Sequence, residues 1–125
     1  MKFKFFFESA PAVVQQAIIN CVFGRKTETQ ACEIIKVHSP GHLFLSKRFF
    51  GNIRLIKSQD KKTIARMQSD YTKGIKLIAN DFFPKVGLIK KLIHYKKYSR
   101  LSKAGSYSIM ILEKRLIIKY LDCKL

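Results

Sequence analysis

The histidines are the side chains of this chain that are best suited to catalysis or metal binding. His38 and His42 flank the three-residue turn S-P-G in H-S-P-G-H and lie four residues apart. That spacing places two side chains on one face of a helix, but Pro40 and Gly41 prevent a continuous helix between them. We therefore expect ordinary loop or core histidines and no metal site.

The other groups that could do chemistry are similarly uninformative. Cys21, Cys32 and Cys123 are odd in number and none forms a C-x-x-C pair, which favours reduced core cysteines over disulfides. The chain has no phosphate-binding loop, no dinucleotide fingerprint and no zinc-ligand spacing. We expect no catalytic residue, no cofactor and no small-molecule substrate. A small basic ribonuclease stays open, because Lys, Arg, His and Tyr can suffice for that reaction.

The charge of the chain gives the strongest indication of function. Its 125 residues carry 25 Lys and Arg against 8 acids, for a formal net charge of +17. A compact protein with this charge repels itself unless a polyanion lies nearby. Nucleic acid is the usual partner, because each neutralised phosphate releases counterions. An anionic membrane surface is the weaker alternative, and we expect no membrane partner.

The charge is concentrated in two acid-free intervals. Residues 82–112 contain no Asp or Glu, and residues 34–59 contain none either. Cations there can contact phosphates, and aromatic rings among them can stack on unpaired bases. The predicted RNA-binding residues are Arg54, Lys57, Lys85, Lys90, Lys91, Lys96, Lys97, Arg100, Lys103, Lys114 and Arg115, and the candidate stacking rings are Phe83, Tyr95 and Tyr98.

The elements that would position these residues are predicted to be mixed. A helix starting after Ser9 and ending at Gly24, and a second over residues 60–78 capped by Asp60, follow from apolar residues at three- and four-residue steps. Residues 2–7, 31–38, 42–48, 52–58, 89–98 and 106–121 are interpreted as strands. The expected fold class is α+β: a single domain, 1–125, with a ferredoxin-like sheet, two helices on one face and a long basic hairpin.

The second half of the chain resembles a known family. The segment N-I-R-L-I-K-S-Q-D over residues 52–60, the F-F-P beginning at Phe82 and the K-R-L-I beginning at Lys114 resemble motifs of ribosomal small-subunit protein S-ten. The resemblance covers residues 52–121, while the N-terminal extension, 1–50, would complete the sheet. It implies a basic hairpin that binds ribosomal RNA and neighbouring small-subunit proteins.

The sequence thus predicts a non-enzymatic structural constituent of the small ribosomal subunit. The resemblance and the composition favour a mitochondrial ribosome in the matrix, with a bacterial or other organellar ribosome as the alternative. Two other functions stay open: a ribonuclease toxin of a toxin–antitoxin pair, and a general nucleic-acid-binding module.

Overall fold

The structure is a computed structural model that describes the backbone of residues 2–82 and 95–122, and the side chains of 2–80 and 105–122 within them. This part of the chain is helical and contains no strand of a sheet. The elements are α1 (Phe3–Ser9), α2 (Ala12–Val22), α3 (Glu28–His38), the 3-10 turn η1 (Pro40–His42), α4 (Leu43–Gln59), α5 (Lys61–Phe82) and α7 (Tyr95–Leu121).

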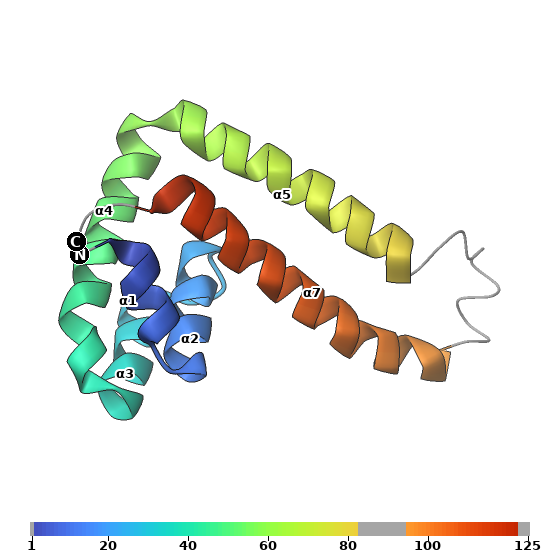
Figure 1. Ribbon diagram of the computed structural model, residues 1–125, viewed down its shortest axis with the longest axis horizontal. Helices are drawn as coiled ribbons and strands as arrows, with labels where there is room; N and C mark the ends of the chain where they lie inside the picture. Colours follow the sequence, from blue (N-terminus) through green and yellow to red (C-terminus); the bar gives the residue numbers. More distant parts are fainter. Residues whose placement is uncertain (1, 83–94, 123–125) are drawn as a thin grey trace.

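The helices form two parts, which we call the body and the hairpin. The body consists of α1 to α4, packed as a compact group at one end of the molecule (Figure 1). The hairpin consists of α5 and α7, which run antiparallel, and its far end extends beyond the body. The C-terminal half of α7 returns along the body, so that α7 packs on both α5 and α2.

One hydrophobic core joins the body to the hairpin. Phe3 and Phe7 of α1 are fully buried, and the Phe3 ring stacks on Phe49 of α4 with ring centroids 3.7 Å apart. Ile117 and Leu121 of α7 belong to the same buried cluster. Burying a side chain of this size stabilises a fold by about 1.5–3 kcal/mol, so the residues at the end of α7 help to anchor the hairpin to the body.

Both predicted helices are confirmed, with shifts of one to four residues at their ends: α2 is Ala12–Val22, and α5 continues to Phe82. The first is α2, whose N-cap is Pro11, while Ser9 ends the preceding α1. Gly24 follows α2 with φ of +80°, a left-handed conformation that glycine adopts easily. The second is α5, where Asp60 accepts hydrogen bonds from the Thr63 amide (3.2 Å) and hydroxyl (2.7 Å). These bonds lower the pKa of the Asp60 carboxyl.

The predicted ferredoxin-like sheet is wrong, because the segments interpreted as strands are helices. Residues 2–7 lie in α1, 31–38 in α3, 42–48 and 52–58 in η1 and α4, and 106–121 in α7. Of residues 89–98, only 95–98 are described, and they begin α7. No sheet therefore exists among the described residues for the N-terminal extension, 1–50, to complete.

The error has a physical cause in the composition of these segments. Runs of Ile, Phe and Val have high strand propensity, but burial follows helical spacing. In α4 the buried residues Ser46, Phe49, Phe50 and Ile53 recur at steps of three and four, and α3 begins with a capping box between Thr27 and Gln30. Gly51, which lies between the segments 42–48 and 52–58 that were predicted to be separate strands, lies inside α4.

Two segments that resemble ribosomal protein S-ten also differ in secondary structure from the prediction. The segments 52–60 and 106–121 were matched as strands of that family, and both are helical apart from the junction at Asp60. Most of the predicted basic hairpin loop lies at residues 83–94, outside the described residues.

Candidate nucleic-acid interface

The most extended basic surface among the described residues lies along α5. Lys62, Arg66, Lys73 and Lys76 are all exposed and follow one another at steps of four, seven and three residues. At 3.6 residues per turn these steps keep the four side chains within about 80° of the helix circumference and spread them over about 21 Å. We call this set the α5 stripe.

The two described acids near the α5 stripe have their hydrogen-bond partners outside the stripe. Asp60 caps the N-terminus of α5, and Asp70 accepts hydrogen bonds from Tyr120 and Lys119 of α7. The Tyr120 bond is the main cause that lowers the pKa of the Asp70 carboxyl. Within the described part of the chain, no acid lies in ion-pair distance of a stripe residue. The stripe therefore faces solvent as a row of cations.

The opposite face of α5 fixes the direction in which the α5 stripe points. Met67 is buried there, and Ile64 and Tyr71 are partly buried against the core. Gly74 lies so close to α7 that a Cβ atom at this position would be 2.6 Å from Cδ2 of Leu112. Because α5 cannot rotate without losing this fit, its cationic face stays outward.

A second basic surface is a groove between α1 and α7. Its volume is ≈ 600 Å³, and its lining residues are Lys4, Glu8, Ile111, Lys114, Arg115, Ile118 and Lys119. The Lys114 ammonium lies 5.8 Å from the centre of the Phe7 ring. Lys119 is 3.3 Å from Asp70, and its pKa is raised by hydrogen bonding to Tyr120 and then to Asp70. The groove keeps a net positive charge with an apolar floor.

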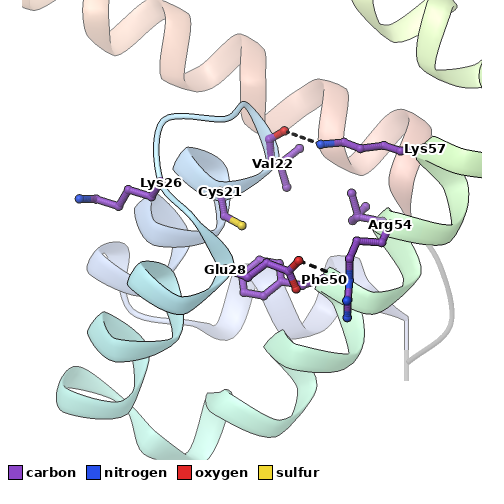
Figure 2. A pocket seen from close by; sticks show the side chains of 8 residues that line it. Cys21, Val22, Lys26, Glu28, Phe50, Arg54 and Lys57 are labelled. Atoms are coloured by element: carbon purple, nitrogen blue, oxygen red, sulfur yellow. Dashed lines mark hydrogen bonds and ion pairs between the residues drawn. The ribbon is translucent and has the colours of Figure 1, made fainter.

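A third basic cluster lines a cavity of ≈ 210 Å³ between α4 and the α2–α3 connection (Figure 2). Arg54 pairs with Glu28 at 3.3 Å, and the Lys57 ammonium donates to the Val22 carbonyl at 3.3 Å. Both cations thus tie α4 to the neighbouring helices. The nearby Cys21 thiol has a raised pKa because it is partly buried, which disfavours the reactive thiolate.

The only buried charge among the described residues is part of a bridge between body and hairpin. Glu113 of α7 is 2 % exposed and accepts two hydrogen bonds from Arg25, at 2.8 and 2.7 Å. The Tyr71 hydroxyl of α5 donates to the same carboxylate at 3.2 Å. The bond to Glu113 raises the pKa of the Arg25 guanidinium, and burial raises the pKa of Tyr71. All three groups are partnered, as expected for a structural network.

The predicted binding residues do not gather in one place. Lys114 and Arg115 lie in the α1–α7 groove, whereas Arg54 and Lys57 lie at the cavity beside α4. Lys96, Lys97, Arg100, Lys103, Tyr95 and Tyr98 belong to the first turns of α7, but their side chains are outside the described set. Lys85, Lys90, Lys91 and Phe83 lie outside the described residues altogether.

The α5 stripe, Lys4 and Lys119 were missed as candidate binding residues. The signal for the α5 stripe is present in the sequence, because its cations recur at helical spacing within a helix that the sequence correctly predicts. A search for acid-free intervals misses the α5 stripe, because Asp70 lies between its residues in the sequence. In the structure the Asp70 side chain binds α7. Lys4 joins Lys114 only through the tertiary fold.

Metal and membrane sites are not apparent in the described part of the chain. His42 shares a 2.6 Å hydrogen bond with Ser39, and no group of three or more His, Cys, Asp and Glu residues there could hold a metal ion. Within the same residues, none of the helices has the length and apolar character needed to cross a membrane.

Comparison with known proteins adds no identity: no family model, curated protein or solved structure matches this chain.

Proposed function

We propose that this chain is an RNA-binding protein that serves as a structural part of a ribonucleoprotein. The observation that carries the proposal is the α5 stripe, a row of four exposed cations without an acid in ion-pair distance among the described residues. A chain of net charge +17 gains most from a partner that is itself a polyanion. The α1–α7 groove supplies further cations to the same partner.

The proposal favours a structural role over catalysis. Two of the described acids that could act as acid or base, Glu113 and Asp70, have partners that hold the fold. Glu113 binds Arg25, and Asp70 binds Tyr120. A nuclease needs a base and an acid that converge on one phosphate, and these two carboxylates serve separate helix contacts.

The narrower form of the proposal is a constituent of the small ribosomal subunit, as the sequence resemblance implied. It requires binding to ribosomal RNA and to neighbouring ribosomal proteins. This ribosomal form of the proposal predicts that the protein belongs to a mitochondrial or other organellar ribosome. The experiment below separates it from general RNA binding.

Affinity purification of the tagged full chain without nuclease, followed by RNA sequencing, tests the function. We expect co-purified RNA that is released as salt rises, with ribosomal RNA dominant and co-sedimentation with small subunits if the narrower form holds. Mixed RNA in light fractions would reject the ribosomal form alone. Absence of bound RNA at low salt would reject RNA binding, and cleavage of added RNA by the purified protein would indicate the ribonuclease toxin instead.

A further inference from the structure

Building on the proposed RNA binding, we infer that the α5 stripe grips the phosphate backbone of a base-paired duplex, not an extended single strand. The inference concerns the form of the ligand, which the charge alone does not specify. It rests on the shape, length and composition of the surface that α5 exposes.

Among the described side chains, no exposed aromatic ring lies beside the stripe on α5. Sites that hold single strands combine cations with exposed aromatic rings, because stacking offsets the ordering of a flexible strand. The Tyr71 ring of α5 faces inward, stacked on Phe23 with ring centroids 5.1 Å apart. The large apolar side chain exposed close to the stripe is Leu77, which has no π-face.

The α5 stripe holds its cations on a rigid helix, spread over a defined length. Lys62 and Lys76 stand about 21 Å apart on one straight face, and α5 is braced along α7 by close packing at Gly74. A duplex also presents phosphates on a stiff, straight support. DNA duplexes carry about one charge per 1.7 Å of axis, or about twelve over the length of the stripe. Rigid surfaces of matched length bind without ordering either partner.

The face of α5 that carries the stripe is also polar between the cations. Ser69 and Asn80 share its face and are exposed. Hydroxyl and amide groups donate hydrogen bonds to phosphate oxygens or to the 2′-hydroxyls of an RNA helix. With few apolar side chains, this face contrasts with the α1–α7 groove, whose floor is formed by Ile111 and Ile118. The stripe is therefore the surface best matched to a backbone.

The test compares the intact full chain with the variant K62A/R66A/K73A/K76A. Binding is measured by fluorescence anisotropy against an RNA duplex of about 20 base pairs, about twice the length of α5. One strand of that duplex, made unable to fold on itself, and the matching DNA duplex are measured alongside. Each titration is repeated from about 50 to about 200 mM salt.

The wild type should bind the RNA duplex more tightly than the single strand at every salt concentration. The variant should show a salt slope shallower by about 0.9 per lost contact, or roughly 3 to 4 in all. Raising the salt across this range should therefore weaken duplex binding by the wild type roughly a hundredfold more than duplex binding by the variant. Alanine favours helix, and circular dichroism checks that the variant is folded.

The control variant is K2A/K36A/K47A/R48A. It also removes three Lys and one Arg from exposed positions, but from other elements. Because its net charge equals that of the stripe variant, a general charge effect would change both slopes equally. The inference requires the control to lose markedly less slope on the duplex.

The outcomes separate the inference from the proposed function. Tighter binding of the single strand, or equal slopes for the two variants, would overturn the inference while leaving RNA binding intact. Tighter binding of the DNA duplex would support the stripe as a duplex site and contradict the RNA assignment. Binding to none of the three probes would reject both.

Discussion

At the scale of single residues, two of the described acids, Glu113 and Asp70, join helices to one another. Glu113 receives Arg25 from the body and Tyr71 from the hairpin, and Asp70 receives Tyr120. Each of these contacts joins segments at least 42 residues apart in sequence. Because these acids are used internally, the cations on the surface are left with fewer partners in the protein itself.

The Arg25–Glu113 pair provides a direct test of this reading. Arg25→Ala leaves the Glu113 carboxylate buried with only Tyr71 as a described partner. We expect the free energy of unfolding to fall by about 3 kcal/mol, the lower end for breaking a buried pair, because Arg25 is itself 44 % exposed. Urea denaturation followed by circular dichroism measures the loss.

The matched control is Arg54→Ala, which breaks a pair whose side chains are 70 % and 41 % exposed. Exposed pairs contribute about 0–1 kcal/mol, so this variant should unfold near the wild-type midpoint. Replacing both partners, as Arg25→Met with Glu113→Leu, should recover most of the stability. Equal losses for Arg25→Ala and Arg54→Ala would contradict the role of the bridge.

The sequence could predict cations as binding residues but not their partners. Arg54 and Lys57 lie in an acid-free interval, which predicted that their side chains are free to bind phosphates. The fold brings Glu28 and the Val22 carbonyl to them from other elements. Such pairings depend on tertiary contacts, which a run of residue types does not encode.

At the scale of elements, two residues that mark helix ends gave correct predictions from the sequence. Asp60 caps α5 through Thr63, and Gly24 follows α2 with a left-handed backbone. These signals act within a few residues, so they can be read locally. The other helices were mistaken for strands because each contains a short cluster of Phe, Ile or Val. Their helical form depends on packing against distant helices.

The close approach of α5 and α7 leads to a prediction at Gly74. Alanine there gains up to about 1 kcal/mol of helix propensity, but its Cβ would lie 2.6 Å and 2.8 Å from the two Cδ atoms of Leu112. Overpacking of this kind costs about 1–3 kcal/mol, so we expect a net loss of about 1 kcal/mol. Denaturant unfolding of Gly74→Ala measures it.

A double-mutant cycle with Leu112→Ala identifies the cause. Truncating Leu112 should destabilise the wild type but do less harm, or none, in the Gly74→Ala background. The expected coupling lies between about 0.5 and 3 kcal/mol. Strict additivity would mean that the two helices can separate freely at this point. Gly51→Ala, whose Cβ would lie 3.7 Å from the Arg54 guanidinium, serves as an uncrowded control.

At the scale of the whole molecule, the net charge of +17 opposes the compact state. The positive charges are spread over α4, α5 and α7, so their mutual repulsion acts across the entire surface. A polyanion bound to the folded state relieves this repulsion and stabilises the fold by mass action. Stability and binding are therefore linked through the same charges.

This linkage predicts an unusual response to salt. Raising the ionic strength from about 0.01 to 0.1 M shortens the screening length from about 30 to 10 Å. We expect the melting temperature to rise by about 4–8 °C, which corresponds to roughly 1 kcal/mol. Thermal melts followed by circular dichroism give the value.

The stripe variant K62A/R66A/K73A/K76A, whose net charge is +13, four below the wild type, should respond less to the same change of salt. A parallel thermal melt with sucrose in place of the salt separates charge screening from osmolyte effects, because sucrose is uncharged. A melting temperature that stays constant or falls with added salt would show that self-repulsion does not limit the fold.

The shared core also bears on how the chain folds while it is being synthesised. Phe3 and Phe7 are synthesised before Ile117 and Leu121, which belong to the same cluster, and the Lys4 amide donates to Asp122 at 3.0 Å. Contacts across almost the whole chain slow the folding of a helical protein, whose contacts are otherwise mostly local. Until α7 arrives, the growing chain exposes a phenylalanine-rich surface that is prone to aggregation. During translation, the folding of this chain should therefore depend on chaperones that keep α1 covered until α7 docks.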